Sequence, residues 1–236
     1  MSSGEEEAWL RASVVRRSEL SPGVVLLAFR VESPAFAWKP GQYVQIALPD
    51  PSDLVQPYSI ASAPDAERPG EFELAVSRAG SGLPFAELPL GAPVLASPPQ
   101  GSFVWERGAH SELFVGMGTG IAPLRAMIQA GNRATQITRV LLYGARTEAD
   151  VLFRTELERL AAQSPAFHFE PTLSRPGPLW KGRRGRVHDH LPAIVKSLVA
   201  PRVYVCGTLP MVKDSVKSLV SLGIPRESIA SEAHGE

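Results

Sequence analysis

Three glycines mark the point where an apolar segment gives way to a helical one, in LFVGMGTGIAPLR at residues 113–125. The apolar start predicts a buried strand, and the IAPLRAMIQA that follows predicts a helix. A glycine-rich turn between the two lets backbone N–H groups approach a phosphate, and the helix start adds a partial positive charge. The spacing of Gly116, Gly118 and Gly120 is not the usual dinucleotide fingerprint, so a purely structural turn stays open on this segment alone.

Two other groups of side chains could take part in chemistry. Tyr58 and Ser59 place an aromatic ring beside a hydroxyl, and an ordinary strand with a tyrosine in the barrel wall stays open for this pair. His188-Asp189-His190 has the composition of a metal site, but residues at i and i+2 do not share a helix face. Since no fourth ligand is nearby in the sequence, we predict no metal site there or elsewhere.

Composition narrows the class of protein. The chain has 236 residues, a formal net charge of zero and 44% hydrophobic residues, which favours a globular protein and gives no sign of a nucleic-acid partner. No apolar run reaches the roughly 18 residues of a membrane span. A single cysteine excludes an internal disulfide and a cysteine-ligated iron–sulfur cluster. The acidic start MSSGEEEAW does not resemble a signal peptide, so we expect a cytoplasmic location.

Hydrophobic patterning divides the chain near residues 103–110. Before this point, short β-rich runs separated by Pro-Gly turns predict a small antiparallel barrel. After it, apolar strands alternate with helical stretches, which predicts a parallel sheet covered by helices on both faces. The expected strands of the first part are 13–16, 24–30, 43–48, 58–61, 72–76 and 94–96. The expected strands of the second part are 113–115, 140–143, 167–169, 203–206 and 228–230.

Five motifs occur in a recognisable order: QPYSIASAP, VGMGTGIAPLR, YGART, TLSR and YVCGTLPMV. Together they resemble the ferredoxin–NADP reductase family, including its flavin reductase and oxygenase-reductase branches. The resemblance implies a six-stranded antiparallel Greek-key barrel over residues 8–104 that binds FAD. It also implies a doubly wound five-stranded parallel-sheet domain over residues 108–236 that binds NAD(P)H.

The resemblance assigns roles around the flavin. Tyr58 is expected against the isoalloxazine ring, with the Ser59 hydroxyl near the hydride-accepting N5. The full set expected to contact the flavin is Gln56, Pro57, Tyr58, Ser59, Val76, Arg78, Gly82 and Leu83. Two positions depart from the family: Gln56 replaces the usual phosphate-binding Arg, and Pro84 replaces a Ser or Thr. Flavin is therefore expected to bind weakly unless Arg78 compensates, and a solvated surface role for Arg78 is equally open.

The resemblance also assigns the nicotinamide nucleotide site. Gly116, Gly118, Thr119 and Gly120 are expected at the pyrophosphate. Arg146, Ser174 and Arg175 are expected near the 2′-phosphate of NADPH, which favours NADPH and leaves NADH open. Gly207 and Met211 complete the set of expected contacts.

Three residues are expected at the hydride path: Ser59, Cys206 and Glu232. Cys206 corresponds to a family cysteine beside the nicotinamide, and a buried structural role is its alternative. The chain ends EAHGE, without the aromatic residue that covers the flavin in many members. His234 could titrate near neutral pH, but we expect it to be a frayed terminal residue.

The expected function is hydride transfer from NAD(P)H to FAD, followed by electron transfer to a separate acceptor such as a ferredoxin, a flavodoxin or a monooxygenase. One alternative is a flavin reductase that uses flavin as a diffusible substrate. Another is a family member that binds a nucleotide without catalysis. The basic run at 181–186 is open to three readings: a docking patch, extra charge for the 2′-phosphate, or a solvated loop.

Overall fold

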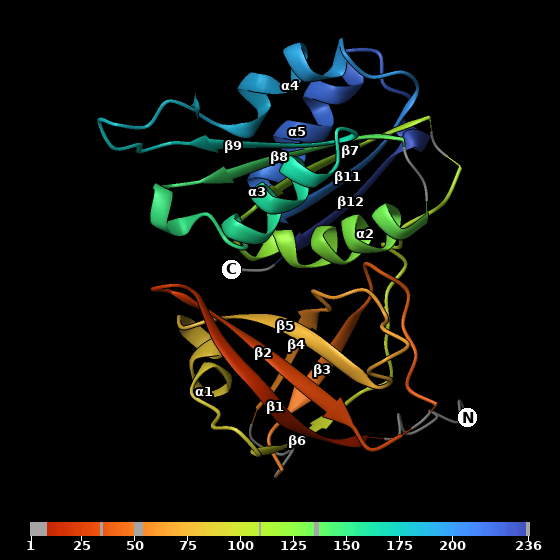
Figure 1. Ribbon diagram of the computed structural model, residues 1–236, viewed down its shortest axis with the longest axis vertical. Coiled ribbons are helices and arrows are strands. Elements are labelled where there is room, and N and C mark those ends of the chain that lie inside the picture. Colours follow the sequence, from red (N-terminus) through yellow and green to blue (C-terminus); the bar gives the residue numbers. More distant parts are fainter. Residues whose placement is uncertain (1–8, 34, 50–53, 109, 135–136, 235–236) are drawn as a thin grey trace, which may run out of the picture.

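The chain folds into two sheets stacked along its long axis, one antiparallel and one parallel (Figure 1). This computed structural model describes residues 9–33, 35–49, 54–108, 110–134 and 137–234. The antiparallel sheet is formed by the first part of the chain and the parallel sheet by the second, as the change in patterning predicts.

The first part forms a six-stranded antiparallel barrel. Its strands follow the order β4-β3-β6-β1-β2-β5, and an isolated bridge between Ile60 and Leu74 links the β4 end of the sheet to β5. Alternate residues point inward, where a cluster that includes Phe29, Phe72 and Phe85 fills the interior. The bounds are β1 Leu10–Ser21, β2 Val24–Val31, β3 Tyr43–Ala47, β4 Val55–Ser59, β5 Glu71–Ser77, α1 Leu83–Ala86 and β6 Pro93–Ala96.

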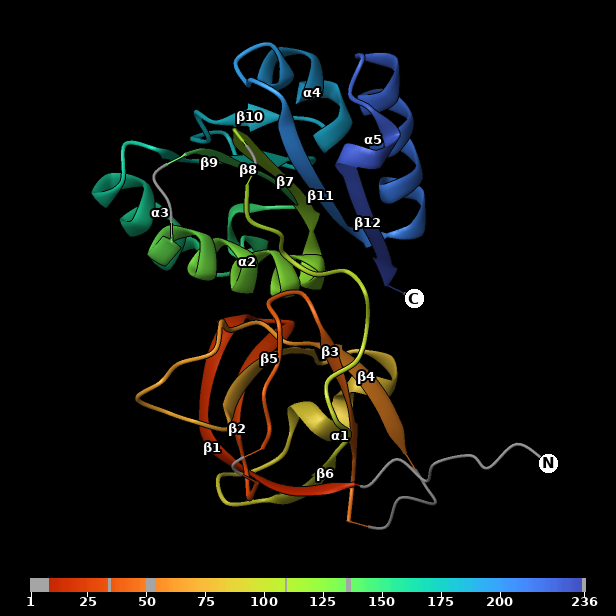
Figure 2. The ribbon, with the colours of Figure 1, turned by 90° about the vertical axis from the view of Figure 1, so that its right-hand side faces the viewer.

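The second part forms a parallel sheet in the order β10-β9-β8-β7-β11-β12. Helices α2 and α3 cover the face toward the barrel, and α4 and α5 cover the opposite face (Figures 1 and 2). The strands are β7 Ser111–Met117, β8 Thr138–Ala145, β9 Phe167–Leu173, β10 Arg183–Arg184, β11 Pro201–Thr208 and β12 Ile229–His234. The helices are α2 Ile121–Ala134, α3 Arg154–Gln163, α4 Val187–Val195 and α5 Leu209–Ser221.

The prediction of five parallel strands was wrong, because the sheet has a sixth. Strand β10 has only two residues, Arg183 and Arg184, which pair in parallel with Thr172 and Leu173 of β9. Two arginines on an edge strand carry no apolar alternation, so the hydrophobic pattern could not reveal them. The strand lies inside the basic run, which is therefore not a plain solvated loop along its whole length.

Helix α2 lies between the sheet and the barrel in both views (Figures 1 and 2). Its residues from Ile121 to Ile128 are all buried, as expected for a helix covered on both sides. One apolar cluster joins α2 to Ala61 and Ala75 of the barrel and to Phe114 and Tyr204 of the sheet. Burial of this shared cluster holds the two parts together. Among the described residues, no helix is long and apolar enough to cross a membrane.

Candidate functional site

The glycine turn connects β7 to α2 through a short 3-10 turn at Gly118–Gly120. Gly118 has a φ of +55°, and nothing lies within 4 Å of where its Cβ would be. Gly120 packs so closely on β11 that a Cβ would lie 2.5 Å from the carbonyl oxygen of Cys206. The Tyr143 hydroxyl donates to the Gly118 carbonyl at 2.9 Å. Glycine is thus required here for both an open, positive-φ position and a close approach.

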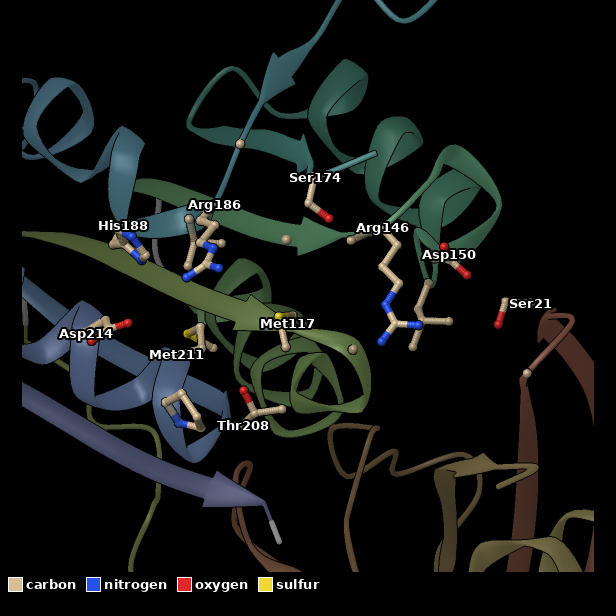
Figure 3. A pocket seen from close by; sticks show the side chains of 18 of the residues that line it. Ser21, Met117, Arg146, Asp150, Ser174, Arg186, His188, Thr208, Met211 and Asp214 are labelled. Carbon is tan, nitrogen blue, oxygen red and sulfur yellow. The ribbon is translucent and has the colours of Figure 1, made fainter. Parts of the chain in front are cut away.

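A cavity of about 480 Å³, called here the sheet cavity, opens at the carboxyl ends of the parallel strands (Figure 3). In open α/β sheets this edge is where ligands bind. Four of the predicted nucleotide contacts line it: Gly118, Arg146, Ser174 and Met211. Five predicted contacts do not line it: Gly116, Thr119, Gly120, Arg175 and Gly207. Gly207 lies directly beneath Met211, since a Cβ there would collide with the methionine Cε.

Two arginines extend into the sheet cavity from different elements, Arg146 after β8 and Arg186 before α4 (Figure 3). Both are exposed, and no ion pair involves either guanidinium within the described part of the chain. Arg175 is also exposed, but its N–H donates to the Arg146 carbonyl at 2.8 Å and it does not line the cavity. Arg186 and His188 were not individually predicted. The basic run was the only sequence signal for Arg186.

A second cavity, of about 440 Å³, lies where the barrel meets the parallel sheet and is called here the boundary cavity. Its lining includes six predicted residues: Gln56, Pro57, Tyr58, Ser59, Gly82 and Thr119. The glycine turn after β5 forms one wall, and its Gly80 has a φ of +57° with open space at the Cβ position. The Gln56 Oε1 accepts a hydrogen bond from the Ser81 hydroxyl at 2.9 Å. This contact leaves the two amide protons of Gln56 available to a ligand.

The boundary cavity suits the flavin that the resemblance implies. Tyr58 and Phe85 form a T-shaped aromatic pair with centroids 5.7 Å apart, and Tyr58 lines the cavity. Its buried hydroxyl has no hydrogen-bond partner among the described residues, and burial raises the pKa of this phenol above its usual value. A buried phenol without a partner is costly unless a ligand satisfies it. A flat ring with polar edges, next to a glycine turn for phosphate, matches these groups.

Three predicted flavin contacts lie elsewhere. Val76 is fully buried in the barrel core, and Leu83 is 46% exposed at the start of α1. Arg78 makes two 2.6 Å contacts with the Glu19 carboxylate and a 3.4 Å contact with Glu87. An arginine already paired with two carboxylates has little reason to bind a phosphate. Pro84, the second departure, lies in the first turn of α1, where the missing N–H leaves no helical hydrogen bond unmade.

The three residues predicted at the hydride path lie close together, and of the three only Ser59 lines the boundary cavity. Cys206 pairs directly with Glu232 in the parallel register of β11 and β12. The Ser59 hydroxyl, from the barrel, donates to the Glu232 carboxylate. Burial raises the pKa of Glu232, and the Ser59 bond partly opposes that shift. Burial, followed by the neighbouring Glu232, raises the pKa of the Cys206 thiol well above its usual value, so the thiol is protonated at neutral pH.

His234 joins this cluster, which the sequence did not indicate. Its Nε2 lies 2.9 Å from Cys206 Sγ, and the ring lines the boundary cavity beside Tyr58 and Ser59. Burial lowers the pKa of the imidazole, which is therefore neutral at pH 7. The expectation of a frayed terminal residue was wrong, because His234 ends strand β12 opposite Thr208. Because side chains alternate between the two faces of a strand, His234 lies on the same face of β12 as Glu232.

The comparison with known proteins agrees with this geometry. Residues 114–217 match the family model described as an oxidoreductase NAD-binding domain. The chain is 40% identical over 238 residues to "Ferredoxin--NADP reductase B" of Sorangium cellulosum, covering 94% of this chain and 96% of the relative. It is 30% identical over 224 residues to NADH-cytochrome b5 reductase 2 of Yarrowia lipolytica, covering 88% and 76%.

A solved structure shares the architecture of both sheets. It is the ferredoxin reductase in carbazole 1,9a-dioxygenase, with a TM-score of 0.85 and 25% identity over 96% of this chain and 69% of that one. The family model covers most of the residues that line the sheet cavity, and the match to the Sorangium cellulosum relative covers the barrel as well. The chain therefore belongs to the ferredoxin–NADP reductase family, and is an NAD(P)H oxidoreductase with FAD as its cofactor.

Proposed function

We propose that the barrel, residues 8–104, binds FAD in the boundary cavity and that residues 108–236 bind NAD(P)H in the sheet cavity. The single observation that carries this proposal is that the two cavities meet at the glycine turn, where Gly118 lines the sheet cavity and Thr119 lines the boundary cavity. A polar cluster lies beside the boundary cavity, with Ser59 from the barrel and Cys206, Glu232 and His234 from the sheet, and Ser59 and His234 line that cavity. Bound FAD would supply the redox chemistry, taking a hydride and releasing electrons.

The residues of the cluster serve to position the reactants. Tyr58 packs against the flavin and gives its hydroxyl to a polar ring atom. The Ser59 hydroxyl donates to Glu232, which fixes its direction, and its oxygen accepts a hydrogen bond at the ring edge. Cys206 offers a neutral, polarisable surface to the nicotinamide, since its raised pKa keeps the thiol protonated. Aligning two rings across the boundary supplies most of the rate enhancement expected of the protein.

We further propose that NADPH is preferred over NADH. Arg146 and Arg186 bring to the sheet cavity two guanidinium groups that form no ion pair among the described residues, and Ser174 adds a hydroxyl. A planar guanidinium binds a phosphate bidentately, so this set favours a 2′-phosphate. Arg175, the residue favoured by the sequence, takes a lesser part because it does not line the sheet cavity.

The electron acceptor is proposed to be a separate protein. The names of the relatives include ferredoxin, cytochrome b5 and a dioxygenase system, so a ferredoxin, a flavodoxin or a monooxygenase component suits this chain. Flavin reduction without tight flavin binding is a second candidate, supported by Gln56 and by Arg78 being engaged with Glu19. A reductase that holds its flavin tightly is yellow when purified, and a reductase that uses flavin as a diffusible substrate is colourless until flavin is added. The paired cluster and the open cavities argue against a non-catalytic member.

The test is anaerobic addition of NADPH to the purified protein, followed by absorbance. A flavin band that bleaches supports the proposal, and a band that persists with both NADPH and NADH contradicts it.

Nucleotide preference is tested with Arg146→Ala. Loss of a charge-assisted contact costs about 1.5–3 kcal/mol, so KM for NADPH should rise roughly 10- to 100-fold with little change for NADH. Arg175→Ala is the matched control, with a smaller rise. Equal rises for the two nucleotides would remove the reason for preferring NADPH.

A further inference from the structure

Three side chains of different chemistry converge at the ends of β11 and β12: Cys206, Glu232 and His234. One ligand atom from each, a thiol sulfur, a carboxylate oxygen and an imidazole nitrogen, lies within 4.8 Å of the other two. Residues at i and i+2 of a strand face the same way, so Glu232 and His234 share one face of β12. Cys206 is the direct neighbour of Glu232 in the register, which brings the sulfur to the same face.

This face is the one that looks toward the barrel. Tyr204 and Cys206 belong to the apolar cluster around α2, and Ala230, two residues before Glu232, packs against the same cluster. His234 lines the boundary cavity and Cys206 is fully buried, so the cluster is reached from that cavity through His234. Ser59 also contacts Glu232 from the barrel side.

The donor set matches a particular class of cation. Thiolate, imidazole and carboxylate together are ligands of Zn²⁺, whereas Mg²⁺ and Ca²⁺ take oxygen ligands. Zinc sites with three protein ligands and an open fourth position are typical of accessible rather than structural sites. Here His234 brings the ligand set to the boundary cavity, where the fourth position would lie. Soft sulfur also selects Zn²⁺ and Co²⁺ over harder cations of the same charge.

We propose that Cys206, Glu232 and His234 form a three-ligand binding site for a zinc-type divalent cation at the boundary cavity. Sulfur and nitrogen ligands of one tetrahedral zinc lie about 3.5 Å apart, so the 2.9 Å pair must open by roughly 0.6 Å. His234 ends its strand, and a rotation of its side chain supplies this opening. Binding converts the Cys206 thiol to a thiolate and releases its proton to solvent.

A cation at this site would block the reaction. This consequence rests on the proposed function, in which the nicotinamide lies against Cys206. The metal would occupy the face of Cys206 that the nicotinamide must reach, so Zn²⁺ should compete with NADPH. The site is thus an inhibitory one, in which metal and reductant exclude each other.

The binding test uses Co²⁺ with the purified full-length protein. Co²⁺ held by a thiolate in a tetrahedral site gives ligand-field bands in the red, beyond the absorption of oxidised flavin. We expect these bands in the wild type and their displacement by Zn²⁺. Cys206→Ser should abolish them, and His234→Gln should weaken Co²⁺ binding at least about tenfold, since even residues behind the ligands change affinity by that much.

The matched control is His168→Gln, because His168 is an exposed histidine on β9 away from both cavities. It should keep the wild-type bands. Absence of bands in the wild type, or bands that persist unchanged in both Cys206→Ser and His234→Gln, would overturn the site. His234 lies at the end of β12, so we expect the His234→Gln variant to fold normally and to report on the site alone.

The kinetic test separates this proposal from the proposed function. Zn²⁺ should raise the apparent KM for NADPH in the wild type, and His234→Gln should require at least about tenfold more Zn²⁺ for the same effect. If NADPH is not oxidised at all, the proposed function fails while the cobalt bands still decide the metal site. If NADPH is oxidised and Zn²⁺ inhibits both proteins equally, the inhibitory role is wrong.

Discussion

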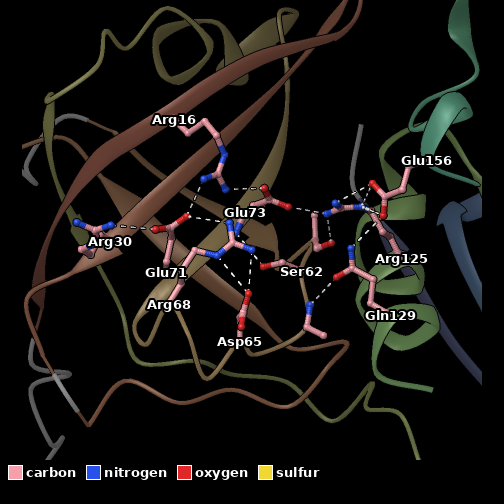
Figure 4. A network of polar contacts seen from close by, with 12 residues as sticks. Arg16, Arg30, Ser62, Asp65, Arg68, Glu71, Glu73, Arg125, Gln129 and Glu156 are labelled. Atoms are coloured by element: carbon pink, nitrogen blue, oxygen red, sulfur yellow. Dashed lines mark hydrogen bonds and ion pairs between the residues drawn. The ribbon is translucent and has the colours of Figure 1, made fainter. Parts of the chain in front are cut away.

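The barrel meets the parallel sheet in two places that differ in how their polar groups are satisfied. At the first, Arg125 of α2 donates to the Ala61 carbonyl and to Glu73 of the barrel, both at 2.7 Å, and it also pairs with Glu156 (Figure 4). We call this contact the Arg125 network. At the second, the boundary cavity, Ser59 contacts Glu232 of the sheet, and the Tyr58 hydroxyl has no partner among the described residues.

The Arg125 network is extensively hydrogen-bonded. Gln129 accepts a bond from the Ala63 N–H and donates to Glu156, and the Ser62 hydroxyl accepts from the Glu73 N–H. The arginine side chain is 8% exposed and lies 4.5 Å from the centroid of Phe153. A paired, buried network of this kind has one favoured geometry, because any displacement leaves a charge unpaired. The boundary cavity instead keeps donors and acceptors free for ligands.

The difference suggests a division of labour. The Arg125 network fixes the angle and distance between the barrel and the sheet, and the boundary cavity uses that fixed spacing to align two rings. Stability should therefore respond to changes in the network, and reaction rate should respond to changes in the cavity. Each prediction below tests whether the two effects separate.

The largest expected effect is that of Arg125→Ala. The change leaves Glu73 and Glu156 without their shared cation, and breaking a buried pair costs about 3 kcal/mol of unfolding free energy. Chemical denaturation measures the loss. The matched control is Arg154→Ala, which removes the exposed pair with Glu158 and should change stability by less than about 1 kcal/mol. Equal losses in the two variants would show that the network does not hold the barrel to the sheet.

Arg125 also shows where sequence reasoning reaches its limit. The residue sits within the motif that identified the glycine turn, yet nothing in the sequence paired it with Glu73, 52 positions earlier. Strands and helices repeat at short periods, so most expected strands and the two-part division could be predicted. An ion pair between segments that are distant in the sequence leaves no periodic pattern, so the sequence could not reveal it. The same reason hid the Arg78–Glu19 pair, and it made Arg78 look available to a phosphate.

The site residues also divide into those that a sequence motif could predict and those that only the tertiary structure reveals. Motifs predicted Tyr58, Ser59 and Cys206 because each stands in a segment that resembles the family. The pattern of the chain could not place His234, because a single histidine near a terminus is indistinguishable from a frayed one. Its contact with Cys206 depends on the register of β11 with β12, which is a tertiary property. That no ion pair among the described residues involves Arg146 or Arg186 is likewise visible only in the fold.

The second effect is that of Ser59→Ala on rate. If the Ser59 hydroxyl positions the flavin edge, its loss should slow flavin reduction roughly 10- to 100-fold, because a hydrogen bond to a developing charge contributes about 1.5–3 kcal/mol. Stopped-flow absorbance measures the reduction step. Ser62→Ala is the control, since the Ser62 hydroxyl belongs to the Arg125 network. It should lower stability and leave the reduction rate near the wild-type value. Slow flavin reduction in the Ser62→Ala variant would contradict the separation of roles between the Arg125 network and the boundary cavity.

A smaller effect is the pH dependence of the Arg125 network. Burial alone would raise the pKa of Glu73, but Arg125 and Arg16 outweigh it and hold the pKa below the ordinary value of 4.5. A carboxylate with a lowered folded pKa stabilises the fold fully above its unfolded pKa. That contribution is lost as the pH falls below 4.5 through the folded value.

Glu73→Gln should therefore lower stability at neutral pH and make the remaining stability less sensitive to acid. Denaturation curves at about pH 7 and about pH 4 measure both. Glu158→Gln, from the exposed pair with Arg154, is the control and should keep the wild-type acid sensitivity. If Glu73→Gln loses as much stability between the two pH values as the wild type, Glu73 is not the group that titrates.

The smallest expected effect belongs to the boundary cavity and is a gain. Gln56→Arg places a cation beside the glycine turn at Gly80, where the flavin phosphate is proposed to lie. A charge-assisted bond adds about 1.5–3 kcal/mol, but the Ser81 hydroxyl loses its acceptor, so flavin retention should tighten by only about tenfold. Equilibrium dialysis measures the retained flavin. Gln163→Arg adds the same charge at the exposed end of α3 and should leave retention unchanged. Unchanged or looser retention in Gln56→Arg would mean that the phosphate binds away from this turn, and the boundary cavity would then hold only the ring.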